Sequence, residues 1–325
     1  MPSSAVRTFT DPDDYAASIR AGEVELTVIG RGQFSAKGTR IELHRLWMQR
    51  FSDSLPRVLH TALVTRRATV QFRTEPGPDL FVSGREIGPT NLLRHSVLDD
   101  WHQRSSGSVS FAGISLPVED MAAVGEAMAG IDLAPPRDTI STAPSPLAMA
   151  KLQRLHAAAI SLAEDAPEII DQPEAARGLE QALIEALVGS LTNCEGRANS
   201  LAQGQHAIVM RRFRRVVEEN PEEPLFIPEI CKAIRVPART LRLCCQEHLG
   251  MGPKRYLLLR RMHFVRRALR REAPETTSVT EIATSYGFWQ LGRFAVRIPV
   301  AVQRTSVCHT SSPTRTAAAS IAKIA

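Results

Sequence analysis

Hydrophobic positions change their spacing along the chain, from alternation in the first 120 residues to helical repeats afterwards. Short runs of β-branched and aromatic residues, separated by Gly, Pro and Asp, predict strands over 24–29, 40–49, 62–65, 69–74, 80–83 and 108–114. Within 40–49, alternate residues fall on opposite faces of one predicted strand. Short strands with frequent turns favour a small barrel or sandwich, so residues 1–140 are predicted to form a β-rich domain.

A helical pattern begins after the proline-rich stretch 135–146. Helices are predicted over 147–164 and 173–192, and the second carries a stripe of Leu179, Leu183, Leu187 and Leu191. Such a stripe fits a dimer interface and fits packing on the barrel equally well. Residues 141–205 are therefore predicted to be a linker and helical segment that can serve dimerisation, with 193–204 as a flexible joint.

Two helix-turn-helix-like segments follow, one at 227–250 and one starting at Ser278. One such unit reads one stretch of major groove, and two in tandem read two successive stretches. Arg235 and Gly287 fall at the tight turn of each unit, where Gly is preferred. The other equivalent pairs are Ile230 and Ile282, Cys231 and Ala283, Ile234 and Tyr286, and Val236 and Phe288.

The outward faces of the second helix in each unit supply candidate DNA contacts, because arginine suits both guanine O6/N7 and phosphate. Cys245 points inward and is predicted to be a small core residue. The candidates are Arg239, Thr240 and Arg242 in the first unit, and Gln290, Arg293 and Arg297 in the second.

A basic helix is predicted over 251–271, between the two units, with many Lys and Arg residues and no acid. A basic helix by itself is typical of a solvated face or of an amphipath that binds membranes or calmodulin. Its position between two helix-turn-helix units favours contacts with DNA phosphates. The candidates for these contacts are Arg255, Arg260, Arg266 and Arg267.

Residues from about 208 to 297 resemble the DNA-binding domain of the AraC/XylS family of bacterial transcription regulators. The match is carried by Val236, Arg239-Thr240-Leu241, Gly250-Met251-Gly252-Pro253, Tyr256-Leu257, Arg261-Met262, Ala268-Leu269, Ile282-Ala283, Gly287-Phe288 and Phe294. The resemblance implies a seven-helix domain whose two recognition helices enter adjacent major grooves. It further implies a variable N-terminal domain, often a cupin-like barrel, that senses a ligand or dimerises.

The resemblance ends after Arg297, where the family continues with an aromatic residue, a basic residue, Phe-Gly and a proline. This chain instead reads Ile298-Pro299-Val300, followed by a Ser-, Thr- and Ala-rich tail. Pro299 would break a recognition helix, and the tail composition has little capacity to form a core. We expect residues 298–325 to be a disordered tail that is out of frame relative to an ancestral gene. A nucleotide sequence whose other two frames lack Phe-Gly and Pro would contradict this.

Charge is distributed unevenly between the two parts of the chain. Residues 206–297 hold 18 Lys and Arg against 9 Asp and Glu, whereas residues 1–205 hold 19 against 25. The whole chain of 325 residues has a formal net charge of +6. A basic domain attached to an acidic one is typical of a polyanion-binding domain with a regulatory partner domain.

Other function classes find little support in the sequence. There is no GxSxG, HExxH or P-loop motif, so no enzyme is predicted. His44, His60, His95 and His102 show no metal-type clustering, nor do the five cysteines Cys194, Cys231, Cys244, Cys245 and Cys308, so no metal and no cofactor are predicted. No apolar run reaches the roughly 18 residues of a membrane helix, and no export signal is visible. A reduced cytoplasm is expected.

The sequence therefore predicts an α+β chain. It would have a β-rich cupin-like N-terminal domain over 1–140, helices over 141–205, and an all-α double helix-turn-helix domain over 206–297. The predicted function is a sequence-specific transcription regulator that binds double-stranded DNA, with RNA polymerase, a small-molecule effector and a second copy of the chain as partners. The alternatives are a DNA-binding-defective protein that acts by dimerisation, and a small-molecule-binding β-domain protein. Trp47, Trp101, Phe72, Phe81 and Phe111 fit either a ligand pocket or a plain core. Neither the effector nor the operator is readable from the sequence, and the choice between activation and repression also stays open.

Overall fold

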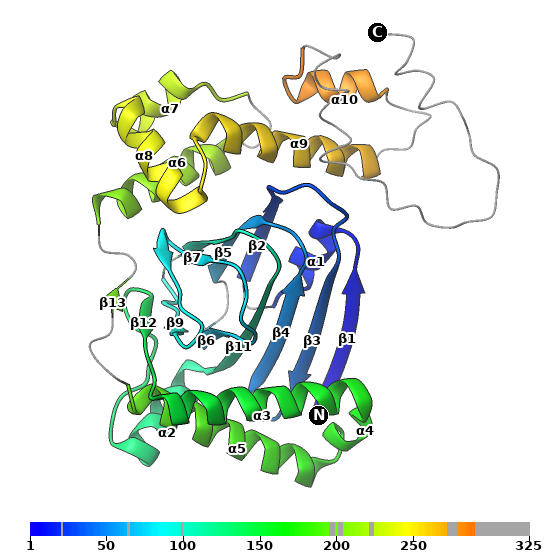
Figure 1. Cartoon of the computed structure of the whole chain (residues 1–325), viewed down its shortest axis with the longest axis vertical. Helices are drawn as coiled ribbons and strands as arrows, with labels where there is room; N and C mark the ends of the chain where they lie inside the picture. Colours follow the sequence, from blue (N-terminus) through cyan, green and yellow to red (C-terminus); the bar gives the residue numbers. More distant parts are fainter. Residues whose placement is uncertain are drawn as a thin grey trace, which may run out of the picture. The chain divides into compact units, whose positions relative to one another are not determined.

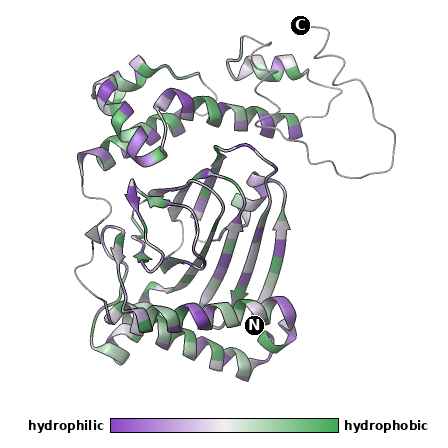
Figure 2. Ribbon diagram, viewed as in Figure 1, coloured by the Kyte–Doolittle hydropathy of each residue, from purple (hydrophilic) through white to green (hydrophobic). Residues whose placement is uncertain are grey.

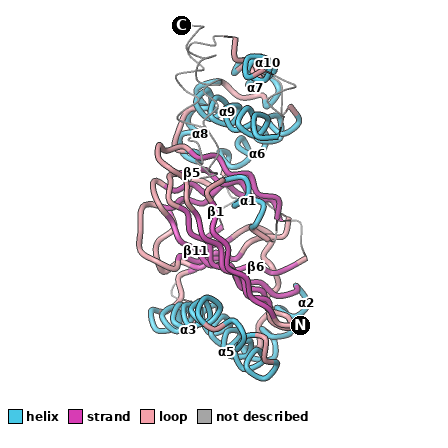
Figure 3. Tube along the Cα trace, turned by 90° about the vertical axis from the view of Figure 1, so that its right-hand side faces the viewer, coloured by secondary structure: helices cyan, strands magenta, loops and turns pink. Residues whose placement is uncertain are grey.

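The computed structural model describes residues 1–20, 22–63, 66–98, 100–194, 199–200, 204–220, 224–271 and 278–289 (Figure 1). The chain divides into two compact units. The first consists of Met1–Leu26 with Phe34–Gly204, and the second of Thr27–Gln33 with Gln205–Ala325. The first unit holds the β-sheets and the second is mainly helical (Figure 3). The predicted α+β organisation, with a β-rich N-terminal part and an α-helical C-terminal part, is confirmed.

Two sheets of mainly antiparallel strands form the first unit. The larger has the order β1-β3-β4-β11-β6-β9-β12-β13 and the smaller β2-β5-β10-β7-β8. The strands are β1 (Ser3–Phe9), β2 (Gly22–Val28), β3 (Ala36–Glu42), β4 (Trp47–Asp53), β5 (Arg57–Leu63), β6 (Arg67–Arg73), β7 (Leu80–Val82), β8 (Arg85–Glu86), β9 (Leu92–Arg94), β10 (Asp100–Ser105), β11 (Val109–Pro117), β12 (Ile140–Thr142) and β13 (Asn199–Ser200).

The central strand β11 of the larger sheet is buried on both faces. Phe111, Gly113 and Ser115 line a cavity on one face. Ala112 and Ile114 join a hydrophobic core on the other face. Because successive side chains of a strand point to opposite faces, this alternation gives one sheet two distinct interiors.

Helices cover the face of the larger sheet that lies opposite the cavity. The helices of this unit are α1 (Pro12–Ser18), α2 (Val118–Ala129), α3 (Pro146–Asp165), α4 (Pro167–Ile170) and α5 (Pro173–Thr192). α3 and α5 lie side by side, and hydrophobic and hydrophilic residues interleave along them (Figure 2). The leucine stripe of α5 packs into the core with the sheet residues, with Leu183 and Leu187 fully buried. This favours barrel packing over a dimer interface for the stripe.

The single strand predicted over 40–49 is wrong. The structure forms a hairpin there, in which β3 ends at Glu42, β4 begins at Trp47, and the Leu43 N–H donates to the Leu46 carbonyl at 2.9 Å. The turn contains no Gly, Pro, Asn or Asp, so the usual signal was missing. The carboxylate of Glu180 on α5 substitutes for that signal, because it accepts the Arg45 and Leu46 N–H groups at 2.7 and 2.8 Å.

The second unit contains a series of helices. They are α6 (Gln205–Glu219), α7 (Ile227–Ile234), α8 (Ala238–Leu249), α9 (Pro253–Arg271) and α10 (Val279–Ser285). Ser278 caps α10, accepting the Glu281 N–H on its hydroxyl at 3.2 Å while Glu281 accepts the Ser278 N–H at 2.8 Å. No helix among the described residues is both long and apolar enough to cross a membrane.

Candidate nucleic-acid interface

The first helix-turn-helix unit is built from α7, a tight turn and α8. Ile230 and Ile234 on α7 are buried, with exposed fractions of 0% and 2%. The turn places Arg235 in the left-handed region with φ 57°. The Val236 N–H then donates to the Cys231 carbonyl at 3.1 Å, which ends the helix and redirects the chain toward α8.

The second helix-turn-helix unit, which begins with α10, repeats this geometry as far as the structure describes it. Ile282 and Ala283 on α10 are buried, as Ile230 is on α7. Gly287 has φ 77°, and the Phe288 N–H donates to the Ala283 carbonyl at 2.9 Å. The predicted equivalence of the two turns is confirmed by the shared left-handed residue and the shared backbone hydrogen bond.

The inner face of α8 is apolar and closely packed. Leu241, Cys244, Cys245 and Leu249 are all fully buried. The Cys245 thiol lies 3.9 Å from the Met210 sulfur on α6, and burial raises the pKa of this thiol well above its usual value. Cys245 is a small core residue, as predicted, and a thiol kept protonated is a poor nucleophile.

The outer face of α8 presents two of the predicted arginines to solvent. Arg239 and Arg242 are exposed, and Thr240 between them is half-buried. Neither arginine has an acidic partner among the described residues. Two unpaired guanidinium groups on one face of a helix supply hydrogen-bond forks suited to guanine edges or to phosphate oxygens.

The predicted phosphate contacts on α9 divide into two pairs. Arg255 is exposed and Arg267 is half-buried. Arg260 and Arg266 are each only 7% exposed, and Arg260 donates to the Val217 carbonyl at 3.2 Å. The Arg260 guanidinium also lies 4.6 Å from the centre of the Phe264 ring. Arg260 is buried with a backbone partner and Arg266 is buried to the same extent, so we leave both out of the candidate interface.

The predicted contacts of the second recognition helix, Gln290, Arg293 and Arg297, lie outside the described residues. So do the predicted tail, residues 298–325, and Cys308. Among the described residues, the candidate interface therefore consists of the outer face of α8 and the exposed part of α9.

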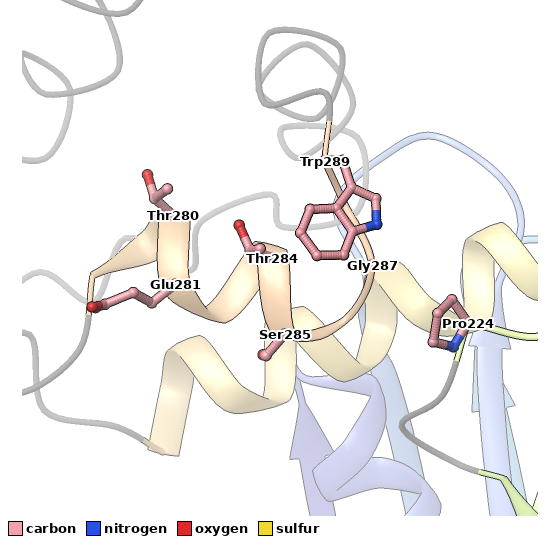
Figure 4. A pocket seen from close by; sticks show the side chains of 7 residues that line it. All are labelled: Pro224, Thr280, Glu281, Thr284, Ser285, Gly287 and Trp289. Atoms are coloured by element: carbon pink, nitrogen blue, oxygen red, sulfur yellow. The ribbon is translucent and has the colours of Figure 1, made fainter.

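A surface groove of about 470 Å³ runs beside α10 (Figure 4). It is lined by Pro224, Thr280, Glu281, Thr284, Ser285, Gly287 and Trp289. The Trp289 ring is 76% exposed and borders the groove at the point where the described chain ends. We assign no ligand to this groove, since none of its described lining residues has a buried polar atom without a partner.

A second candidate site is a cavity of about 50 Å³ between the two sheets of the first unit. Trp101 and Phe111, two of the aromatics expected to line a pocket or a core, lie on its wall. Phe72 packs into the hydrophobic core instead. Trp47 lies beneath the Arg67 guanidinium, and Phe81 beneath that of Arg104, each at 3.9 Å. The volume is enough for a few water molecules or a very small ligand.

His95 is the distinctive polar group of this cavity. It is 1% exposed, stacks on Trp101 with ring centres 3.7 Å apart, and contacts the Gln71 side-chain oxygen at 3.0 Å through Nε2. Burial lowers the pKa of His95 to about 3, so the ring is neutral. With Nε2 donating to Gln71, Nδ1 is an acceptor, and no hydrogen-bond partner for it is present among the described residues. This arrangement was not predictable from the sequence, because His95 and Gln71 are 24 residues apart.

Among the described residues, no group of three or more His, Cys, Asp or Glu side chains has the geometry of a metal site. His60 and His102 are neighbours on β5 and β10, with ring centres 5.1 Å apart. His44 is exposed at the turn between β3 and β4. The described cysteines Cys194, Cys231, Cys244 and Cys245 are free thiols.

Comparison with known proteins agrees with the helix-turn-helix geometry described above for the C-terminal part of the chain. Residues 230–298 match the family model described as a helix-turn-helix domain. The XylDLEGF operon transcriptional activator of Pseudomonas putida is 35% identical over 86 residues, which cover 26% of this chain and 27% of that protein. The XylDLEGF operon transcriptional activator 2 of the same organism is 34% identical over 86 residues, covering 26% of this chain and 55% of that protein. The matches therefore span less than two thirds of either relative.

These matches confirm the resemblance noted from the sequence. The C-terminal part of this chain is a helix-turn-helix domain of the AraC/XylS type. Among solved structures, the AraC-like transcriptional activator CuxR is 15% identical with a TM-score of 0.44, covering 86% of this chain and 99% of that one. ToxT from Vibrio cholerae is 10% identical with a TM-score of 0.29, covering 88% and 96%.

Proposed function

We propose that this chain is a sequence-specific DNA-binding transcription regulator that acts by binding and not by catalysis. The observation that carries the proposal is the outer face of α8, where Arg239 and Arg242 are exposed and unpaired on the second helix of a helix-turn-helix unit. Arg255 and Arg267 on α9 add contacts to the DNA backbone. Gln290, Arg293 and Arg297 would contact bases or nearby phosphates from the second recognition helix.

Charge supports this proposal independently of the fold. The segment 206–297 has twice as many basic as acidic residues, as counted above. A protein that neutralises several phosphates releases counterions, so its affinity for DNA falls steeply with salt. A cytoplasmic location follows from this function, since the DNA of a bacterium lies there.

The experiment that tests the function is binding of the full chain to its own upstream DNA and to random DNA across a salt series. We expect a preference of about a thousandfold or more for the upstream DNA, which is typical of specific recognition. Weak and equally salt-dependent binding to both would contradict sequence-specific regulation. That result would favour the alternative, in which this chain has lost operator recognition and acts by dimerisation.

The same experiment also tests the tail hypothesis. The family match ends at residue 298, next to the position where the sequence departs from the family pattern. A chain with the reading frame restored after Arg297 is expected to bind upstream DNA more tightly than the present chain. Equal affinity of the two chains would show that the tail has no bearing on recognition.

We propose that a small neutral molecule controls the regulator from the cavity of the first unit. Nδ1 of His95 has no hydrogen-bond partner among the described residues, so a ligand with a hydrogen-bond donor would satisfy it. The surrounding Trp101, Phe51 and Phe111 rings favour a ligand that is otherwise apolar. Quenching of the Trp101 fluorescence by a library of small alcohols, phenols and amides tests this, with Trp101→Phe as the control. Quenching that persists in Trp101→Phe would place the ligand elsewhere.

The remaining partners are proposed from the relatives' role. Both relatives are named transcriptional activators, so we propose activation through RNA polymerase for this chain. A reporter fused to the upstream region tests the sign of regulation.

We further propose a homodimer, because two copies would double the length of DNA that is contacted. Light scattering with and without DNA measures the stoichiometry.

A further inference from the structure

The outer face of α8 carries two residues besides the arginines. Leu243 and Gln246 are exposed, and they share that face with Arg239 and Arg242. Arg242, Leu243 and Gln246 lie three, four and seven residues after Arg239, which places all four on one side of a helix. We name Arg239, Arg242, Leu243 and Gln246 the readout row.

Leu243 is the apolar member of this row and is not among the buried core residues of the unit. The core of the unit is formed by the opposite face of α8, including Leu241, Cys244 and Cys245, whereas the Leu243 side chain is 53% exposed. A leucine beside two arginines on a basic surface leaves apolar area in contact with water. That area is removed from water when an apolar partner covers it.

The major groove offers one apolar group of this kind. Each base pair presents hydrogen-bonding groups there, and thymine alone adds a C5-methyl group. The chemistry of the readout row matches this surface: guanidinium forks suit guanine, a leucine suits the thymine methyl, and a glutamine amide suits adenine N6 and N7. With a rise of 1.5 Å per residue, Arg239 and Gln246 lie about 10 Å apart along the axis, which corresponds to about three base pairs.

We propose that Leu243 is a specificity-determining residue that reads a thymine through its C5-methyl group, beside an adenine read by Gln246. The proposal rests on the DNA-binding function proposed above and assigns the base class that this face of α8 prefers. Leu243 contributes packing on the methyl group, while Arg239 and Arg242 fix the helix in the groove.

The test removes single methyl groups from the DNA. The full chain is first used to select preferred duplexes from a random pool. Each thymine of the selected site is then replaced by deoxyuridine, which lacks only the methyl group. We expect one position at which this replacement weakens binding about fourfold, the effect of one buried methyl group.

Combining the Leu243→Ala variant with the deoxyuridine replacement completes a double-mutant cycle. In Leu243→Ala, the deoxyuridine replacement at that position is expected to have no further effect, because the methyl group has lost its partner. Ile208→Ala is the matched control, since Ile208 is an exposed apolar residue on α6 of the same unit, with 46% of its side chain exposed. This control is expected to retain the full fourfold effect. Thermal melting of both variants checks that they fold.

The outcomes separate the two levels of the proposal. A pool from which no sequence is enriched overturns the DNA-reading function and this inference with it. Enrichment without any methyl-dependent position, or a methyl effect unchanged in Leu243→Ala, overturns the reading by Leu243 alone. Loss of affinity in Leu243→Ala that is equal on all sequences also overturns it, because such a loss would assign Leu243 to a contact that does not depend on sequence.

Discussion

Arg235 and Gly287 have the same left-handed backbone conformation at equivalent positions in the turns that follow α7 and α10. Their φ angles are 57° and 77°. The residue that follows each of them donates its N–H to a carbonyl five residues earlier, at 3.1 and 2.9 Å. The chain therefore uses one backbone turn twice, once with a residue suited to it and once with a residue that is not.

Arg235→Gly is expected to stabilise the protein by about 0.5–1 kcal/mol. A side chain in the left-handed region costs roughly 1–2 kcal/mol, and the greater freedom of unfolded Gly offsets part of the gain. Urea unfolding followed by circular dichroism measures the change. Lys232→Gly, at an exposed position within α7, serves as the contrast and is expected to destabilise by about 1 kcal/mol.

Gly287→Ala is expected to act in the opposite direction and to destabilise by about 1–2 kcal/mol. A Cβ at this position would lie 3.0 Å from the Pro224 Cβ and 3.3 Å from an Arg261 guanidinium nitrogen. The strain of the left-handed backbone adds to this crowding. An unchanged unfolding midpoint in Gly287→Ala would show that the turn tolerates a side chain.

Arg239→Ala and Arg255→Ala are expected to weaken DNA binding in different ways. The first should cost about 1–3 kcal/mol on the preferred site and relax selection at one base pair. The second should weaken binding to all sequences and reduce the salt slope by about one, since it removes a phosphate contact. Titrations against preferred and random duplexes separate the two, with Arg177→Ala on α5 as a control for the loss of one charge. An equal loss on all sequences in Arg239→Ala would reassign that residue to phosphate.

Glu180→Ala is expected to destabilise the first unit by about 3 kcal/mol. The carboxylate is 6% exposed and accepts the two N–H groups of the turn between β3 and β4, so its removal leaves both donors without a partner. Chemical unfolding measures the loss. Glu185→Ala, an exposed carboxylate on the same helix, should change stability by less than about 0.5 kcal/mol. Similar effects of the two variants would show that the turn forms without Glu180.

Stability is expected to fall as the pH decreases below about 6.5. Burial lowers the pKa of His95 to about 3 and that of His156 to about 4, whereas both histidines take up a proton near pH 6.5 when unfolded. Between these values the unfolded state binds more protons, so each group contributes up to about 1.4 kcal/mol of lost stability per pH unit. Urea unfolding at pH 7, 6 and 5 should show a shallower dependence in His95→Gln. An identical slope in that variant would mean that His95 is protonated in the folded state.

The sequence predicts the elements whose signal is local. The apolar stripe of α5 and the prolines before it give the helix 173–192 without error, and the equivalence of the two turns follows from aligned residues. The helix predicted over 147–164 differs from α3 by one residue at each end.

Strands whose stability comes from distant partners were predicted poorly: β10 was missed, and β5 was predicted only at its end, by the strand expected over 62–65. The strand β10 carries Asp100, His102 and Arg104 on one face, and β5 contains Arg57 and His60, so neither has a clear alternation of apolar and polar residues. Arg57 is fully buried because it pairs with Asp53 at 3.1 Å and with the Gln103 side chain at 2.7 Å. A charged residue whose partner is 46 positions away gives no local signal of burial.

The candidate site was predictable in part for the same reason. Arg239 and Arg242 follow from helix periodicity, and the structure presents both to solvent. Arg260 and Arg255 were both predicted to contact phosphates because both lie on the basic helix. Helix packing instead directs Arg260 toward the Val217 carbonyl. Helical spacing alone does not show which side of a uniformly basic helix faces its neighbours.

The short span of the readout row limits what one unit can specify. About three base pairs recur by chance roughly once in 64 positions, while a genome offers about a million or more competing sites. A single α8 therefore carries too little information to address one promoter. The missing information has to come from the second unit or from a second copy of the chain, so the number of helices that reach DNA together decides how many genes this protein can distinguish.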